Sequence, residues 1–342
     1  MNRLLTEPLR LLNATSMRPK TGRSTSIDVL TARWPAPVWT TLLALGAAAF
    51  ATVGLLGAYR YVDNYWLYRG FLPPKDPGYV TSRGTAIRME VASAALGGRH
   101  QPVDVYLPPG YAAHPARRYP VLYLLHGEPG RPGAFLATVR MGVVEDELVA
   151  LHRAQPVILV MPFGSTGSFT DKEWANGARP HEGWETFLAR DVVKAVDNRF
   201  RTIRAGWARG VGGLSEGGYG AINIAIHHPG EFGLVESWSG YQIADNLPSI
   251  FAGRRSLLAY NTPLDTLTRS APALRRAHTF FWLYTGSDDR FRSQNQDFVS
   301  KLAAAGLAHR FRIVRGGHNW ALWRGNAAAS YLAASRHLHH VA

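Results

Sequence analysis

The chain of 342 residues has a formal net charge of +14 and contains no cysteine. Its length suits one large domain or two small ones, and the lack of cysteine excludes disulfides, thiolate catalysis and cysteine metal sites. The basic charge favours an anionic partner. The sequence has neither a zinc-ligand spacing nor a basic run interleaved with aromatic residues, so nucleic acid is not a predicted partner.

The N-terminal region predicts a membrane anchor at residues 34–59, which include no charged side chain. The stretch from Val38 to Tyr59 supplies the roughly 20 apolar residues that a spanning helix needs. More basic residues precede the anchor than follow it, which favours a basic cytoplasmic tail at 1–33 and an extracytoplasmic location for the rest. Residues 60–80 are then a juxtamembrane linker and 81–342 the catalytic domain. The small-residue run "AAAFA" leaves cleavage as a signal peptide open.

From residue 81 onward, strand patterns alternate with helix patterns, which predicts a mostly parallel sheet with helices on both faces. Period-two spacing predicts antiparallel strands at 85–94 and 101–109. Further strands are predicted at 119–127, 156–164, 210–215, 233–240, 279–289 and 309–317, and helices at 144–154, 184–200, 219–230, 294–306 and 321–338. Residues 242–277 show no clear strand and are interpreted as an insertion of the kind that roofs a pocket.

The stretch "GGLSEGGYG" contains a G-x-S-x-G pattern from Gly213 to Gly217. The pattern alone is weak, but here it follows a predicted strand and begins a predicted helix, which is the setting of a nucleophile elbow. Ser215 is therefore the candidate nucleophile. A serine hydroxyl needs a base to take its proton.

The partners of such a serine follow it in the order acid, then histidine. Asp288 and Asp289 come directly after one predicted strand, and His318 comes after the last one. All of these side chains are therefore expected at the same edge of the sheet. Backbone N–H groups of Glu216 and of Glu128, which lies in the loop "LLHGEPG", are the candidate oxyanion donors.

These motifs resemble the putative esterase family of α/β-hydrolases. The resemblance covers about residues 85–335 and includes "LYLLHG", "GGLSEGGYGAINIAIHHPGEFG", "SWSG", "GSDD" and "GGHNWALWR". The family includes S-formylglutathione hydrolase, enterochelin-type esterases, feruloyl esterase domains and the antigen 85 mycolyltransferases. The resemblance implies an α/β-hydrolase fold with a serine nucleophile, a histidine base and an acid, and it assigns the acid to Asp289. No metal or organic cofactor is implied.

The sequence departs from the family pattern after the nucleophile, where many members have methionine and this chain has Glu216. Negative charge beside a developing oxyanion is unfavourable. The carboxylates of Glu216 and Glu128 are therefore expected either to turn away and pair with an arginine or a backbone amide, or to meet a cationic or hydroxyl-rich substrate group. Trp320 is a candidate pocket wall. Residues 171–173 are interpreted as a solvated loop.

The leading hypothesis is a membrane-anchored, extracytoplasmic serine esterase. Its substrate would be a carboxylic ester of an envelope lipid, an aminoacyl lipid or a sugar. An acyltransferase would use the same acyl-enzyme with another hydroxyl in place of water, so the residues do not separate the two. A catalytically silent hydrolase-like scaffold is the third hypothesis, and oligomeric state is not predicted.

Overall fold

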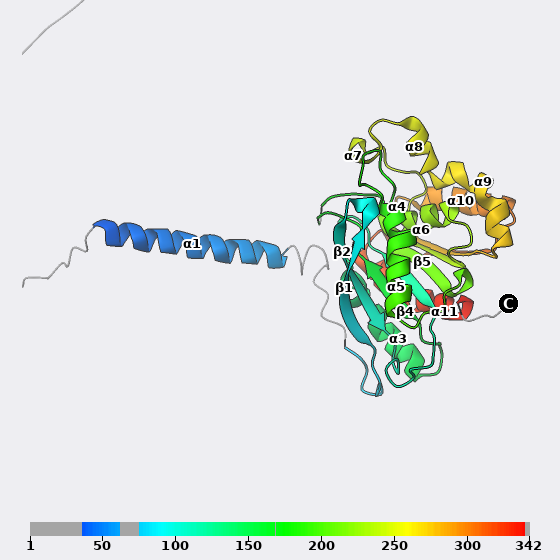
Figure 1. Ribbon diagram of the computed structural model, residues 1–342, viewed down its shortest axis with the longest axis horizontal. Coiled ribbons are helices and arrows are strands. Elements are labelled where there is room, and N and C mark those ends of the chain that lie inside the picture. Colours follow the sequence, from blue (N-terminus) through cyan, green and yellow to red (C-terminus); the bar gives the residue numbers. More distant parts are fainter. Residues whose placement is uncertain (1–35, 62–74, 168, 339–342) are drawn as a thin grey trace, which may run out of the picture. The chain divides into compact units, whose positions relative to one another are not determined.

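The computed structural model describes residues 36–61, 75–167 and 169–338 (Figure 1). The predicted tail at 1–33 lies outside these residues, as does most of the predicted linker at 60–80. The chain divides into two compact units, one up to Leu56 and one from Gly57 onward. Each unit is described by itself.

Helix α1 (Ala36–Tyr61) contains residues 36–59 of the predicted anchor, whose first two residues lie outside the described ranges. Its stretch Pro37–Ala58 has 22 residues with a mean hydropathy of 1.9, which makes it long and apolar enough to cross a membrane. Proline is well placed in the first helical turn, where its missing N–H has no intrahelical partner in any case. The α1 helix therefore agrees in length and composition with the predicted span.

The described residues of the C-terminal unit contain an eight-stranded sheet with the order β1-β2-β4-β3-β5-β6-β7-β8. Strands β1 and β2 are antiparallel to each other, and β2 is antiparallel to β4. All other neighbours are parallel. The strands are β1 (Thr85–Ser93), β2 (Arg99–Leu107), β3 (Val121–Leu125), β4 (Ile158–Pro162), β5 (Arg209–Leu214), β6 (Leu234–Trp238), β7 (Phe280–Gly286) and β8 (His309–Val314).

The central strands are buried on both faces because successive side chains point to opposite sides of the sheet. In β3, Val121, Tyr123 and Leu125 belong to one hydrophobic core, whereas Leu122 and Leu124 belong to the other. The continuous apolar run of this strand in the sequence thus reflects two cores separated by one sheet.

Helices cover both of these cores (Figure 1). Side chains of α5, α6, α9 and α10 contribute to the first core, and side chains of α3 and α11 to the second. The predicted helix at 184–200 is a continuous helical segment whose middle is a π-helix, η3. The helices outside the insertion are α2 (Ala134–Ala137), α3 (Met141–Ala150), α4 (Trp184–Thr186), η3 (Phe187–Val192), α5 (Val193–Arg199), α6 (Glu216–His227), α10 (Arg292–Ala304) and α11 (Trp320–His337), with short 3₁₀ turns η2 (Ala94–Leu96) and η4 (Gly206–Ala208).

The predicted insertion at 242–277 is helical and contributes no strand to the sheet as described. It contains α7 (Pro248–Phe251), α8 (Arg255–Tyr260) and α9 (Pro263–Arg276), and both α7 and α9 begin with proline. The strand order, the parallel strands from β3 onward and the helices on both faces define the α/β-hydrolase fold that was expected.

Candidate active site

Ser215 sits at the turn between β5 and α6, in a backbone conformation with φ 55° and ψ −123°. Positive φ is uncommon for residues other than glycine. The flanking glycines make the turn sterically possible, because a Cβ on Gly213 or Gly217 would lie 2.4 or 1.9 Å from the carbonyl oxygen of Leu125. The turn therefore places the serine hydroxyl beyond the end of β5.

Ser215, His318 and Asp289 form a continuous hydrogen-bonded row. The Oγ atom of Ser215 lies 2.8 Å from Nε2 of His318, and Nδ1 of His318 lies 3.0 Å from Oδ2 of Asp289. Ser215 follows β5, Asp289 follows β7 and His318 follows β8, so the carboxyl ends of three parallel strands bring the groups to one edge of the sheet. Asp288, in contrast, is exposed.

Asp289 is held in its ionised form by hydrogen-bond donors. Burial by itself would raise the pKa of this carboxyl, but the hydrogen bonds from His318 and from the N–H of Phe291 hold the pKa below its ordinary value. An ionised Asp289 accepts a hydrogen bond from Nδ1–H of His318, which leaves Nε2 as the acceptor that faces Ser215. The rings of Phe291 and Trp323 pack edge-on against the His318 ring, with centroid distances of 5.3 and 5.1 Å.

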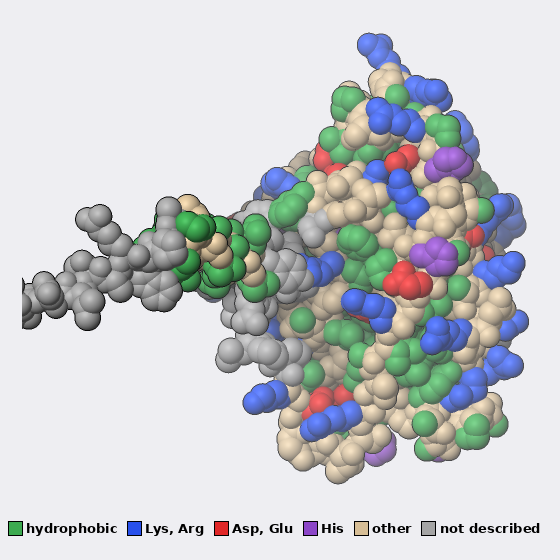
Figure 2. Space-filling view, turned by 60° about the vertical axis from the view of Figure 1, so that its left-hand side comes forward, with side chains coloured by type: hydrophobic (Ala, Val, Ile, Leu, Met, Phe, Trp, Pro, Cys, Tyr) green, Lys and Arg blue, Asp and Glu red, His purple; other side chains and the backbone are tan. Residues whose placement is uncertain are grey.

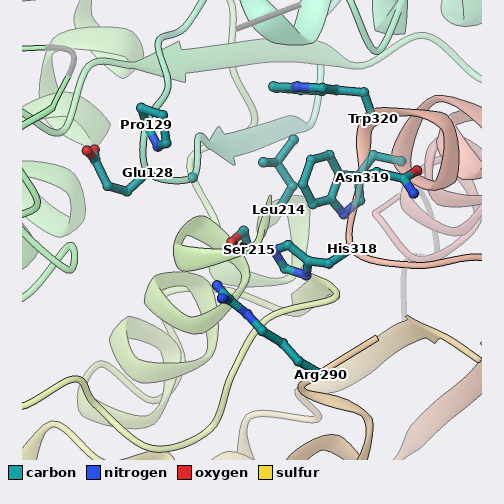
Figure 3. Close-up of a pocket in the computed structure, with 10 residues that line it drawn as sticks. Glu128, Pro129, Leu214, Ser215, Arg290, His318, Asn319 and Trp320 are labelled. Atoms are coloured by element: carbon teal, nitrogen blue, oxygen red, sulfur yellow. Dashed lines mark hydrogen bonds between the residues drawn. The ribbon is translucent and has the colours of Figure 1, made fainter. Parts of the chain in front are cut away.

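A cavity of about 180 Å³ opens at Ser215 (Figure 3). Trp320 lines it, as the sequence predicted, and Trp323 lines it as well as packing against His318. No residue of 242–277 is part of this lining in the described structure, so the expected roof from the insertion is not found here. The lining residues are Gly127, Glu128, Pro129, Leu214, Ser215, Arg290, His318, Asn319, Trp320 and Trp323.

The two candidate oxyanion donors come from different elements. Glu216 is the first residue of α6, where backbone N–H groups have no partner within the helix. Glu128 lies in the loop after β3 and lines the cavity, and Figure 3 shows its carboxylate pointing away from Ser215. Glu216 thus follows Ser215 directly in the chain and Glu128 lines the same cavity as Ser215, while the Glu128 carboxylate points away from the serine.

His126 ties the Glu128 loop to the loop after β4. Its Nε2 accepts a hydrogen bond from the N–H of Gly164 at 3.1 Å, so the ring proton is on Nδ1 and is donated to the carbonyl of Gly127 at 3.0 Å. Burial lowers the pKa of His126 to about 4, which keeps the ring neutral. The indole N–H of Trp174 donates to the His126 carbonyl at 3.1 Å. This histidine therefore positions the loop rather than reacting.

The Glu216 side chain lies in a group of acidic side chains, here called the carboxyl cluster, which consists of Glu128, Asp171, Glu173 and Glu216. Glu216 is only 3% exposed, and its Oε2 atom has no hydrogen-bond partner. Burial raises the pKa of Glu216 well above its ordinary value, and the neighbouring carboxylates raise it further.

The structure differs from the expectations for these residues in two places. Glu216 does not line the cavity, in agreement with the alternative that it turns away, but no member of the carboxyl cluster forms an ion pair with an arginine within the described residues. Residues 171–173 are not a solvated loop, since Glu173 is fully buried and Lys172 is bound to Glu182 at 2.9 Å. The loop instead folds inward and brings its acidic side chains against Glu216.

Basic side chains are spread over the surface of the C-terminal unit. Figure 2 shows Lys and Arg scattered over the visible face, with no single basic stripe. Within the described residues, no cluster of His, Cys, Asp or Glu has the arrangement of a metal site.

The fold and the serine–histidine–aspartate row define a protein of the α/β-hydrolase class. The chain belongs to the family described as "Putative esterase", whose model matches residues 93–332.

Individual proteins are also similar to this chain in sequence or in fold. An uncharacterised protein of Corynebacterium glutamicum is 29% identical over 234 residues, which cover 64% of this chain and 53% of that protein. An esterase of Mycobacterium tuberculosis strain H37Rv is 26% identical over 250 residues, which cover 63% of this chain and 52% of that protein. The chain thus spans about half the length of these curated relatives. A solved ferulic acid esterase shares the fold with a TM-score of 0.66 at 24% identity, covering 74% of this chain and 99% of its own.

Sequence reasoning missed several residues around the site. Arg290 lines the cavity and directly follows Asp289, a position that gave no signal because a basic residue in an exposed turn is ordinary. Trp174 was missed because its role depends on a contact with a residue 48 positions away. A tryptophan in a polar loop is a sequence signal that could have indicated such an anchor, because so large an apolar side chain is usually buried, as Trp174 is here.

Proposed function

We propose that this protein is a serine esterase that hydrolyses a carboxylic ester through an acyl-enzyme on Ser215. The observation that carries the proposal is the row of hydrogen bonds from Ser215 through His318 to Asp289 at a cavity. Membership of the esterase family and the likeness to an esterase of Mycobacterium tuberculosis support it. His318 takes the Ser215 proton as Oγ attacks the ester carbonyl, and Asp289 stabilises the imidazolium that forms.

The tetrahedral intermediate needs donors where its negative charge develops. The N–H groups of Glu216 and Glu128 fill this role, and the position of Glu216 at the start of α6 adds the positive end of the helix dipole. Burial favours the uncharged form of the Glu216 carboxyl, which does not line the cavity, so the unusual residue after the nucleophile does not oppose the reaction. His318 then gives its proton to the leaving alcohol, and water releases the acyl group by the same steps in reverse.

For the substrate, we propose an ester of an envelope lipid or a sugar, with Trp320 as a wall of its pocket. The hypothesis of an aminoacyl lipid depended on a glutamate facing the pocket. Glu216 is buried and does not line the cavity, and the Glu128 carboxylate points away from Ser215, so these two glutamates give no support to an aminoacyl lipid and none to the hydroxyl groups of a sugar.

We further propose that α1 anchors the protein in a membrane, with residues 1–33 in the cytoplasm and the catalytic residues 81–342 outside it. The apolar stretch Pro37–Ala58 and the arginines before it support this topology. Protease added to intact spheroplasts should digest the catalytic domain, and sequencing of the N-terminus of the membrane-bound protein shows whether the anchor is retained. A domain that is protected until the cells are lysed would reverse the topology.

The test of the esterase itself uses a fluorophosphonate probe, which modifies activated serines. The wild type should be labelled and should hydrolyse a short-chain aryl ester, and Ser215→Ala should lose both properties while circular dichroism shows an unchanged fold. Ser300→Ala, which removes an exposed hydroxyl on α10, serves as the matched control and should be labelled. Labelling that survives in Ser215→Ala would refute the proposal.

Addition of glycerol or a sugar, followed by product analysis, separates hydrolysis from acyl transfer.

A further inference from the structure

Arg290 places a positive charge at the cavity that the proposed reaction does not use. It follows Asp289 directly, lies between β7 and α10, and lines the same cavity as Ser215 and His318. Figure 3 shows its guanidinium pointing toward Ser215. A guanidinium is charged at every ordinary pH and presents a planar fork of donors that fits carboxylate and phosphate groups.

The described residues offer this guanidinium no carboxylate partner. Its one interaction within them is with the ring of Phe291, whose centroid lies 4.6 Å from the guanidinium carbon. The Phe291 ring in turn packs against the His318 ring. The cation–π contact therefore holds the charge in a fixed position relative to the base without neutralising it.

The acidic side chains nearby do not cancel this charge in the cavity. Glu216 is buried in the carboxyl cluster and is absent from the cavity lining. Glu128 lines the cavity, but its carboxylate points away from Ser215 (Figure 3). The Asp289 carboxylate already accepts hydrogen bonds from His318 and from the N–H of Phe291. The unpaired charge that faces a bound ester is therefore positive.

We infer that Arg290 is a specificity-determining residue that binds an anionic group, a carboxylate or a phosphate, on the ester substrate. This inference rests on the proposed esterase function and narrows its substrate class to esters that carry a negative charge near the scissile bond. The group can belong to the acyl part, as in the monoester of a dicarboxylic acid, or to the alcohol part, as in a phosphorylated glycerol. The ion pair adds binding energy for the charged substrate over its neutral analogue.

The experiment compares kcat/KM for matched pairs of esters. The acyl-side pair is para-nitrophenyl adipate, which is negatively charged, and para-nitrophenyl heptanoate, which is neutral. The alcohol-side pair is monobutyrylglycerol phosphate and monobutyrylglycerol. In the wild type, the charged member of one pair should be preferred, and the preference should weaken with added salt because salt screens a partly exposed ion pair.

Arg290→Gln should lower this charged-to-neutral ratio about fivefold, the size of an exposed ion pair, and Arg290→Glu should lower it further. Arg290→Lys should recover part of the ratio because it keeps the charge and loses the fork. The matched control is Arg292→Gln. Arg292 is exposed, lies two positions along the chain, bonds to the Ser287 carbonyl and does not line the cavity, so its removal should leave the ratio at the wild-type value.

The outcomes separate the two proposals. A ratio that is the same in the wild type, Arg290→Gln and Arg290→Glu, with both esters hydrolysed, overturns the role of Arg290 and leaves the esterase intact. An equal loss on charged and neutral esters also overturns it, because Arg290 would then act on the reaction and not on recognition. If the wild type hydrolyses none of the four esters, or does not react with the fluorophosphonate probe, the esterase proposal is overturned and this inference with it.

Discussion

Asp289 and Glu216 are two buried carboxyls on either side of the same serine, and their environments have opposite effects on them. Asp289 is 6% exposed and Glu216 is 3% exposed, so burial alone does not distinguish them. Asp289 accepts hydrogen bonds from an imidazole and a backbone N–H, which lower its pKa. Glu216 faces other carboxyls, and its pKa is raised. The partners of a buried carboxyl therefore decide which protonation state it holds.

This difference matches the two tasks that the site requires. The acid beside His318 has to be ionised, because only a carboxylate holds the Nδ1 proton and stabilises the imidazolium. The residue after the nucleophile has to avoid negative charge, because the oxyanion develops next to it. In the carboxyl cluster, burial and the neighbouring carboxylates raise the pKa of Glu216 and so favour its uncharged form, at a position where many family members have methionine.

The largest effect is expected from Asp289→Asn. An asparagine amide cannot accept the Nδ1 proton in the same way, so the His318 ring adopts the wrong tautomer and kcat should fall by about three to four orders of magnitude. Steady-state hydrolysis of an aryl ester measures this effect. Asp288→Asn is the matched control in an exposed position one residue away and should retain kcat within about threefold of the wild type. If Asp288→Asn lost more kcat than Asp289→Asn, the acid would be Asp288 and not Asp289.

The second prediction concerns the stability of the carboxyl cluster. Burial and the charge of Asp171 raise the pKa of Glu173 from 4.5 to about 8. In the unfolded chain Glu173 releases its proton near its ordinary pKa, whereas the folded protein keeps it, so the contribution is full below pH 4.5 and is lost as the pH rises toward about 8. Glu173→Gln cannot ionise and should therefore melt a few degrees higher than the wild type at the upper end of this window.

Glu182→Gln provides the opposite case in the neighbouring loop. Burial favours the protonated form of Glu182, but hydrogen bonds from Trp184 and Lys172 outweigh it and hold its pKa below the ordinary value. Its stabilisation is therefore present at neutral pH and is lost in acid, so Glu182→Gln should melt lower than the wild type above its ordinary pKa. Melting temperatures measured from below pH 4.5 up to about pH 8 check both Glu173→Gln and Glu182→Gln. Equal pH profiles for the wild type and Glu173→Gln would mean that Glu173 is ionised in the folded protein.

The fold and the row of three polar residues could be predicted because both follow from local patterns. A buried strand has a recognisable apolar run, and Ser215, Asp289 and His318 each come just after such a run. Parallel strands that share a sheet place their carboxyl ends together, so position along the chain was enough to bring these side chains to one edge.

The carboxyl cluster could not be predicted in this way. Its members come from the loop after β3, the loop after β4 and the start of α6, and the inward course of residues 171–173 depends on the packing of Trp174 under the Glu128 loop. Polar residues in a loop read as solvated unless the tertiary contacts are known. The cavity-facing direction of Arg290 is likewise set by its packing on Phe291.

The smallest effect is expected at Glu128, the member of the carboxyl cluster that lines the cavity. Partial burial and the charge of Asp171 raise the pKa of its carboxyl to about 7, so it changes charge near neutral pH. Once ionised, the Glu128 carboxyl adds a negative charge to the loop that we propose donates to the oxyanion. Because the carboxylate points away from Ser215 and is half exposed, we expect only about a twofold loss of kcat/KM for a neutral ester.

The measurement is the ratio of kcat/KM for Glu128→Gln to that of the wild type, from one pH unit below 7 to one above. The two enzymes share every other titrating group, so the effects of those groups cancel in the ratio, which should increase about twofold as only the wild type gains the charge. Glu90→Gln removes an exposed carboxylate on β1 and should give a flat ratio. A flat ratio for Glu128→Gln as well would mean that the charge of Glu128 does not reach the oxyanion. Protection of the reaction from negative charge would then depend on Glu216 alone.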